Sequence, residues 1–202
     1  MKTRSRFFNS EAQEILEDIF RDVETKDTWQ GESVLIALGK KEASKSLFRA
    51  RVVDPNRIKT VLAQPEKQLG PPPSEFAGTG RMNAYGISIF YGATDKRTAI
   101  AEVRPSVGST VLVAKFDIVR DVQILDLDIL ANLFVKESYF SEQFADQITH
   151  AVFLRKLGKL CSKPVLPGAE KFEYLVTQAV AEFLASNPAI DGIAYPLSLI
   201  HI

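Results

Sequence analysis

An arginine, a tyrosine and a glutamate follow one another in "GTGRMNAYGISIFYGATDKRTAIAEV", residues 79–104. Small residues flank Arg81, so a ligand could approach the backbone closely there, and a guanidinium offers a rigid fork of donors suited to phosphate. Tyr91 ends an apolar stretch, where its ring could stack on a planar group. Glu102 stands among alanines and a valine, so we expect its carboxylate to be partly desolvated. The segment therefore predicts a site for a ligand with phosphate and planar groups.

Each of these residues also has a purely structural interpretation. Arg81 could cap a helix or form a surface ion pair, and Tyr91 could be a core or strand-edge ring. Glu102 could be a solvated helix residue that pairs with Arg97 or Thr98. Taken singly, none of these residues identifies a function.

The elements that must position these residues mix strands and helices. Apolar spacing and turn residues predict helices over residues 10–23, 95–104, 139–157 and 170–186, and strands over residues 46–53, 86–91, 109–118, 121–128 and 189–196. Residues 65–80 hold three successive prolines, which predict irregular structure throughout that loop. Strands and helices do not alternate strictly, so we expect an α+β (mixed α/β) fold rather than a doubly wound parallel sheet.

Composition excludes several classes of protein. Twenty-five basic and twenty-five acidic residues balance in 202, so nothing predicts bulk attraction to nucleic acid or to an anionic membrane. One cysteine, Cys161, is typical of a reducing compartment, and two distant histidines give no metal-ligand cluster. No apolar run is long enough to span a bilayer. We expect a soluble cytoplasmic protein without a metal.

An ordered set of segments resembles the RES domain family. The segments are "LFRAR", "LGPPP", "GRMNAYGISIFYGA", "TAIAEV", "YLVTQAVAEFL" and "DGIAYP", over roughly residues 46–198. The resemblance implies an ADP-ribosyltransferase-like fold, with a split β-sheet core, flanking helices and an N-terminal helical extension. We expect residues 46–202 to form the NAD-binding catalytic domain and residues 1–45 the extension. The chain stops where the family continues into a closing strand, so its C-terminus is expected to be incomplete.

The resemblance also assigns residues to the site. Arg81, Tyr91 and Glu102 match the motif arginine, tyrosine and glutamate of the family, and Arg49 matches its early arginine. The family serine follows "GIAYP" directly, whereas here Leu197 stands at that place and the serine is Ser198. Arg49, Arg81, Tyr91 and Ser198 would bind NAD+, and Glu102 would act in catalysis with Arg81 and Tyr91.

What the resemblance implies is a bacterial toxin of a type II toxin–antitoxin module that cleaves NAD+ between nicotinamide and ribose. NAD+ is then a substrate rather than a cofactor, and phosphate or water is the acceptor. A carboxylate would oppose the positive charge that develops on the ribose. The partner would be an Xre-type antitoxin protein that blocks the cleft.

Three other functions stay open from the sequence. A protein ADP-ribosyltransferase would use the same NAD+ cleft with a macromolecular acceptor, and a catalytically inactive module would bind without reaction. A nuclease toxin is disfavoured by the balanced charge and the lack of aromatic–basic interleaving. For residues 1–45, docking of a further partner, self-association into a homo-oligomer and covering of the core stay open.

Overall fold

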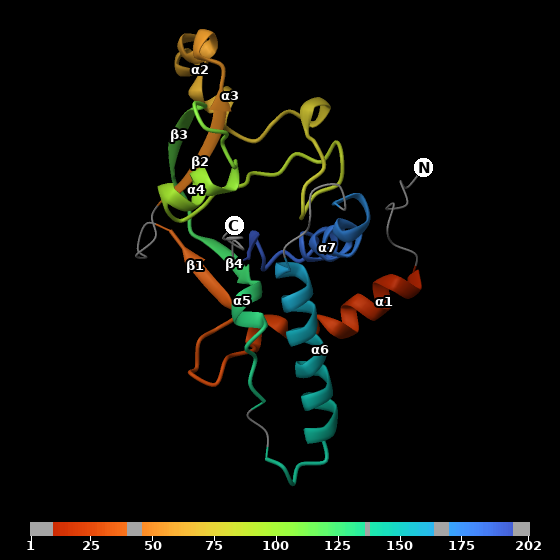
Figure 1. Cartoon of the computed structure of the whole chain (residues 1–202). Coiled ribbons are helices and arrows are strands. Elements are labelled where there is room, and N and C mark those ends of the chain that lie inside the picture. Colours follow the sequence, from red (N-terminus) through yellow and green to blue (C-terminus); the bar gives the residue numbers. More distant parts are fainter. Residues whose placement is uncertain (1–9, 40–45, 136–137, 164–169, 196–202) are drawn as a thin grey trace. The chain divides into compact units, whose positions relative to one another are not determined.

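A computed structural model describes residues 10–39, 46–135, 138–163 and 170–195, and these residues form the α+β fold that the sequence predicts (Figure 1). Their strands lie in two separate sheets. The chain divides into two compact units, of which unit 1 comprises residues 1–36 and 123–198 and unit 2 comprises residues 37–122 and 199–202. The expected division into an extension of residues 1–45 and a catalytic domain stays a prediction.

Unit 1 combines helices with a three-stranded sheet, and the boundary of the unit falls within the edge strand β1 of that sheet. Its elements are α1 (Ser10–Ile19), the 3-10 helix η1 (Val23–Thr25), α5 (Leu127–Leu130), α6 (Phe144–Ser162), α7 (Glu170–Leu184), β4 (Val122–Asp126) and β5 (Gly192–Ala194), with β1 (Leu35–Leu38) in the same sheet. The sheet has the order β1-β4-β5, and β5 runs parallel to β4 with Ile193 opposite Leu125. The central strand β4 is thus paired on both sides.

Apolar side chains from separate parts of the sequence fill the core of unit 1. Those that are almost completely buried are Val23, Val34, Leu125, Leu127, Leu130, Leu154, Cys161 and Leu184. The rings of Phe20, just after α1, and Phe183 on α7 lie 5.6 Å apart. This burial of apolar surface is what holds the N-terminal residues of unit 1 against α6 and α7.

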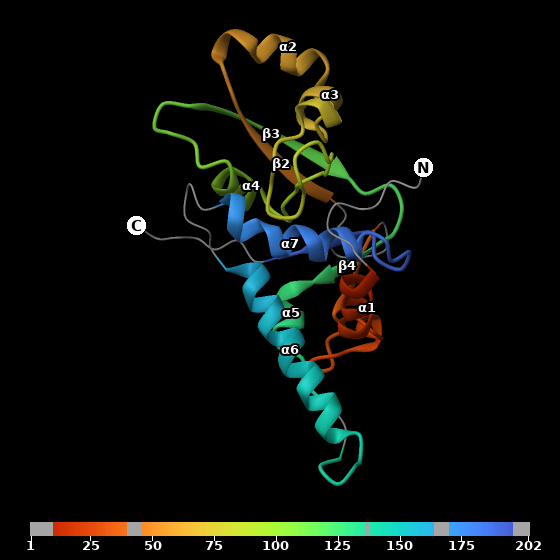
Figure 2. The same cartoon turned by 90° about the vertical axis from the view of Figure 1, so that its right-hand side faces the viewer.

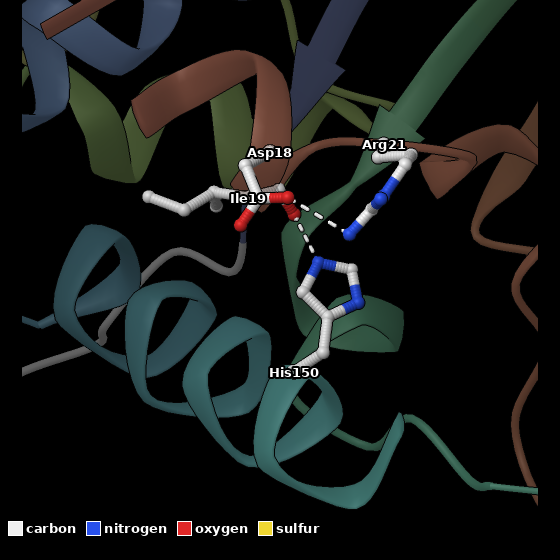
Figure 3. A network of polar contacts seen from close by, with 4 residues as sticks. All are labelled: Asp18, Ile19, Arg21 and His150. Atoms are coloured by element: carbon white, nitrogen blue, oxygen red, sulfur yellow. Dashed lines mark hydrogen bonds and ion pairs between the residues drawn. The ribbon is translucent and has the colours of Figure 1, made fainter. Parts of the chain in front are cut away.

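A polar contact fixes the end of α1 on α6. The Nε2–H of His150, on α6, donates to the carbonyl oxygen of Ile19 at a distance of 2.6 Å (Figure 3). This carbonyl belongs to the last residue of α1, where backbone acceptors have no partner within the helix. Beside it, Arg21 and Asp18 form an exposed ion pair of 2.8 Å. The histidine therefore caps α1 from a neighbouring helix.

Unit 2 is built on a two-stranded antiparallel ladder. Its elements are β2 (Ser46–Val53), η2 (Pro55–Arg57), α2 (Ile58–Ala63), α3 (Pro65–Leu69), η3 (Ser74–Phe76), α4 (Lys96–Glu102) and β3 (Thr110–Asp117). The two strands pair over their full length, from Ser46 opposite Asp117 to Val53 opposite Thr110. The helices α2 and α3 lie together at one end of this ladder (Figure 2), where Val61 and Leu69 pack with Val53.

The helix α4 begins at a side-chain cap. The carboxylate of Asp95 accepts hydrogen bonds from the backbone N–H of Thr98 at 2.9 Å and from the Thr98 hydroxyl at 2.6 Å. These two bonds hold the pKa of Asp95 below its ordinary value. An aspartate before the first turn is a strong start signal for a helix. The cap fixes where α4 begins, and therefore where its last residue, Glu102, lies.

The prediction of a strand over residues 86–91 is wrong. Gly86 lies in a turn with a φ of 84°, residues 87–91 form no strand, and an isolated bridge between Phe48 and Ala93 follows them. A side chain takes one backbone acceptor of this segment, since Asn83 Nδ2 donates to the carbonyl of Ile87 at 2.9 Å, and the hydroxyl of Ser88 ties the segment to the carbonyl of Pro72 at 2.6 Å. Side-chain bonds of this kind compete with secondary structure.

Other element predictions are shifted or incomplete. Residues 65–80 are not irregular throughout, because Pro65 begins α3 at a first-turn position where its missing N–H costs nothing. The helix α6 begins at Phe144 rather than at residue 139, since the Ser141 carbonyl and hydroxyl accept the N–H groups of Phe144 and Gln143 in a turn. Among the described residues, no helix combines the length and apolar character needed to cross a bilayer.

We expect Gly158→Ala to destabilise the protein, although alanine is the better helix former by about 1 kcal/mol. A Cβ at position 158 would lie 2.8 Å from the carbonyl oxygen of Leu127 and 3.1 Å from the backbone nitrogen of Ala131, where α6 crosses α5. Forcing these backbones apart should cost about 1–3 kcal/mol. Urea denaturation measures the change, and Gly78→Ala, where a Cβ meets open space, is the control. An unchanged or higher unfolding free energy for Gly158→Ala would contradict this packing.

Candidate active site

Arg81 sits in a tight turn that is held from both sides. The N–H of Gly80 donates to the carbonyl of Asn83 at 2.9 Å, so Arg81 and Met82 form the tip of the turn. The side chain of Met82 is buried, whereas that of Arg81 is half-buried. The buried methionine therefore anchors the turn, while Arg81 stays half-buried.

Tyr91 fastens this turn through its hydroxyl. The hydroxyl donates to Asn83 Oδ1 at 2.7 Å and accepts the backbone N–H of Met82 at 3.1 Å. It comes so close to the chain that a Cβ at Gly80 would lie 2.7 Å from the hydroxyl oxygen. Gly80 is therefore required by close approach, and Tyr91 positions the backbone on either side of Arg81.

Asn83 is a functional candidate that the sequence analysis missed. It is buried, and its Nδ2 lies within hydrogen-bond distance of the carbonyls of Gly78, Ala84 and Ile87, at 2.8, 3.2 and 2.9 Å. Its other polar side-chain atom, Oδ1, accepts a hydrogen bond from the Tyr91 hydroxyl. The residue stands in "GRMN", but its burial, which obliges the amide to find partners for its polar atoms, is visible only in the structure. Asn83 thus holds together the loop that carries Arg81 and Tyr91.

Glu102 is the last residue of α4, and it lies in the electrostatic field of Arg81. The side chain keeps an exposed surface, yet the surrounding protein desolvates the carboxylate and raises its pKa above the ordinary value. The cations Arg81 and Arg104 act in the opposite direction and favour the ionised form. The alternative pairing of Glu102 with the Thr98 hydroxyl does not form, because that hydroxyl donates to Asp95.

Arg49 lies on β2 and takes part in the same group. Burial lowers the pKa of Arg49, as does the neighbouring Arg51, while Tyr91 acts to raise it. Its guanidinium carbon lies 5.5 Å from the centre of the Phe90 ring, which itself packs on Phe116 at 4.8 Å. Its Nη1 is buried and makes no hydrogen bond within the described residues. A buried cationic donor in this state is a favourable position for an anion.

The two arginines of β2, Arg49 and Arg51, have different surroundings. Arg51 is exposed, and its Nη1 donates to the carbonyl of Gln68 near the end of α3. Arg51 thus has a structural role, since it links β2 to the end of α3. Arg49 has the unsatisfied donor and the contact with Phe90 instead.

The structure thus brings four predicted residues together within unit 2, and we call Arg49, Arg81, Tyr91 and Glu102 the four-residue cluster. Tyr91 interacts with Arg49 and with the turn of Arg81, and Arg81 interacts with Glu102. Ser198 lies outside the described residues, so its assignment stays a prediction. Within the part of the chain that the structure describes, no three His, Cys, Asp or Glu side chains gather closely enough to hold a metal ion.

Comparison with known families now gives these residues a context. Residues 49–199, about three quarters of the chain, match the family model of the RES domain, so the chain belongs to the RES domain family. No curated protein and no solved structure matches it significantly. At the level of the family, membership supports a toxin-like module related to NAD. The likeness to ADP-ribosyltransferases stays a prediction.

We expect Arg81→Ala to raise the pKa of Glu102 further, because it removes one of the two cations that favour the carboxylate. Carbon-detected NMR titration of the Glu102 carboxyl measures this pKa. Arg81→Lys keeps a charge and should give a smaller rise. Arg97→Ala, which removes a cation from the exposed side of α4, is the control and should leave the pKa in place. An unchanged Glu102 pKa in Arg81→Ala would show that Arg81 does not act on the Glu102 carboxylate.

We expect Tyr91→Phe to lower the free energy of unfolding by about 1–3 kcal/mol, because it deletes a hydroxyl that two buried groups use. Tyr85→Phe is the matched control, since the Tyr85 side chain is mostly exposed and its change should stay within about 0.5 kcal/mol. Urea denaturation compares them. Equal stability of the two variants would show that Tyr91 does not fasten the Arg81 turn.

Proposed function

We propose that this chain consumes NAD+ by cleaving the bond between nicotinamide and ribose, at the four-residue cluster. The feature that supports this most directly is Glu102, which keeps an exposed surface, interacts electrostatically with Arg81 and has a pKa that partial burial raises. Perturbed acids next to a specific charge partner are typical of functional sites. Membership of a family of toxin-like, NAD-related modules supports the choice of substrate.

The main requirement of the reaction is to stabilise the positive charge that develops on the ribose. When the carbon–nitrogen bond breaks, nicotinamide leaves with the bonding electrons as a neutral molecule, and the ribose becomes oxocarbenium-like. A preorganised carboxylate at that position stabilises the transition state more than the ground state. Glu102 supplies this charge when it is ionised, so its raised pKa sets the lower pH limit of the reaction.

The cations of the cluster suit the pyrophosphate of NAD+. Arg81 presents a half-buried guanidinium, and Arg49 has a buried donor, Nη1, without a hydrogen-bond partner within the described residues. A phosphate oxygen would satisfy that donor and offset the desolvation of the guanidinium. Arg49 and Arg81 together would hold the dinucleotide while Glu102 acts at the ribose.

Tyr91 would act through its ring. Its hydroxyl is bonded to Met82 and Asn83, which orients the phenol, and the ring would stack on nicotinamide or ribose. Ser198 would hydrogen-bond the nicotinamide amide or the ribose. No metal or further cofactor is part of this proposal, and NAD+ is the substrate.

The acceptor distinguishes the variants of the proposal. Attack by water forms a carbon–oxygen bond, releases a proton and gives ADP-ribose, whereas inorganic phosphate gives ADP-ribose-1″-phosphate. A protein acceptor would make the chain an ADP-ribosyltransferase. Mass spectrometry of a reaction with phosphate and without it separates these products. We further propose that the protein acts in the cytoplasm and that an Xre-type antitoxin restrains it.

We expect Glu102→Gln to reduce the rate of NAD+ loss ten- to a thousandfold, because losing one preorganised charge costs about 2–4 kcal/mol in the transition state. Release of nicotinamide, followed by proton NMR, measures the rate. Glu75→Gln, an exposed glutamate of η3, is the control.

Although Glu102→Gln should lose activity, its free energy of unfolding should not fall. The folded pKa of Glu102 is raised, so the folded state binds more protons than the unfolded state between the two pKa values, and the free energy of unfolding falls as pH rises through that window. Glutamine does not titrate, so it removes this fall in the free energy of unfolding and should keep the variant at least as stable as the parent at neutral pH.

NAD+ loss at the parent rate in Glu102→Gln would overturn the assignment, and a parent chain without NAD+ loss would indicate an inactive binding module.

A further inference from the structure

The turn that closes α4 has an arginine at a position where glycine is usual. Arg104 has a φ of 43°, in the left-handed region, and its N–H donates to the carbonyl of Ala101 at 3.2 Å. Many helices end in this way, with a left-handed residue two positions after the last helical one, and glycine adopts that conformation without a steric cost. Arginine carries a Cβ, so the backbone of the turn is strained at Arg104.

The neighbouring residue adds to this strain. Pro105 follows Arg104, and a residue before proline normally has an extended backbone with a negative φ. Among the described residues other than glycine, a positive φ occurs at Arg104 and at Asp22 of unit 1, and aspartate visits the left-handed region more readily than arginine. The stability of the turn therefore does not explain the arginine, and strain of this kind is characteristic of functional sites.

The side chain of Arg104 is exposed and acts on Glu102. It makes no hydrogen bond or ion pair within the part of the chain that the structure describes. Desolvation raises the pKa of Glu102, whereas the charges of Arg81 and Arg104 act to lower it. Two cations thus reach this carboxylate from two different segments, one from the Arg81 turn and one from the end of α4.

Glu102 needs this support because its position disfavours the ionised form in two ways. The surrounding protein desolvates the carboxylate, and the C-terminal end of a helix carries a partial negative charge that repels it. The last turn of α4, which the structure describes in full, contains no basic residue. Along the chain, the nearest cation that can offset both effects is therefore Arg104.

The other charged groups near α4 do not act on Glu102 in the same way. The strands β2 and β3 pack against this helix. The titratable residues of α4 and its cap, of the two strands and of the adjoining loop are Asp95, Lys96, Arg97, Arg49, Arg51, Lys115, Asp117 and Tyr91. Within the described residues, the charges that shift the pKa of Glu102 are those of Arg81 and Arg104.

We propose that Arg104 is a positioning residue of the candidate active site, whose guanidinium keeps the Glu102 carboxylate ionised, and that the chain accepts a left-handed backbone at Arg104 to place this charge. The inference rests on the proposed function for what the carboxylate does to NAD+. The action of Arg104 on Glu102 can be measured without NAD+, so the two ideas can fail separately.

Three substitutions separate the charge of Arg104 from its strain. Arg104→Gly removes both, Arg104→Ala removes the charge but keeps a Cβ, and Arg104→Lys keeps the charge. We expect a higher urea midpoint for Arg104→Gly than for Arg104→Ala, because glycine relieves the left-handed backbone. Asp22→Gly is the control, since it relieves a positive φ in unit 1, where the Asp22 side chain forms no cap hydrogen bond.

Carbon-detected NMR titration at low ionic strength reports the Glu102 carboxyl directly. Its pKa should rise by the same amount in Arg104→Gly and Arg104→Ala, rise least in Arg104→Lys and stay unchanged in Asp22→Gly. Added salt should reduce the difference between the variants and the parent, because an exposed cation is screened.

Nicotinamide release as a function of pH tests the consequence for the reaction. On the acid side, where the rate follows the ionised fraction of Glu102, Arg104→Gly and Arg104→Ala should be about two- to fivefold slower than the parent. On the alkaline side, where Glu102 is ionised in every variant, both should match the parent. Arg104→Lys should restore most of the acid-side rate.

Four results would overturn the proposal. The first is a Glu102 pKa that does not change in Arg104→Gly and Arg104→Ala, whatever the activity. The second is a loss of rate that is equal at all pH values, which would assign Arg104 to substrate binding. The third is a lower urea midpoint for Arg104→Gly than for Arg104→Ala, which would show that the turn holds no strain. The fourth is a parent chain that releases no nicotinamide, which would end the proposed function as well, even if the NMR titration still showed Arg104 acting on Glu102.

Discussion

The candidate site depends on one electrostatic balance, between the desolvation of the Glu102 carboxylate and the cations that keep it ionised. Desolvation prevails in part, since the pKa of Glu102 is raised even with Arg81 and Arg104 nearby. A carboxylate in this state is costly to the fold but effective against a developing positive charge, because it needs little reorganisation. Hydrogen bonds from Tyr91 fix the turn that carries Arg81, one of these two cations.

Those hydrogen bonds belong to a loop whose conformation is held by side chains rather than by a regular element. Tyr91 and Asn83 join the Arg81 turn to the segment before Ala93, and that segment is joined to β2, the strand of Arg49, at the bridge with Phe48. Glu102 reaches the same place because Asp95 fixes the start of a short helix. The cluster is thus assembled from a strand, a turn, a loop and a helix end, which are linked by specific polar contacts.

The sequence predicted the regular part of this arrangement and missed the irregular part. The strand of Arg49 and the helix of Glu102 follow from local signals, namely apolar alternation and an aspartate cap. The family motif groups Arg81, Tyr91 and Glu102, which all lie in unit 2, and their roles stay a prediction. The prediction of a strand over residues 86–91 failed where side-chain bonds hold the segment, from Asn83 to the carbonyl of Ile87 and from Ser88 to that of Pro72, and apolar periodicity does not reveal such bonds. Asn83 was missed for the same reason, since its role depends on which carbonyls the fold brings to its amide.

The central claim is that an ionised Glu102, supported by Arg81, drives the cleavage of NAD+. The most direct measurement is the rate of nicotinamide release by the full chain as a function of pH, for the parent and for Arg81→Lys. The account predicts a rate that falls with acid at a midpoint above the ordinary pKa of glutamate, and a midpoint that moves upward when lysine replaces Arg81. A parent chain that releases no nicotinamide, or an acid midpoint that is the same in both proteins, would contradict it.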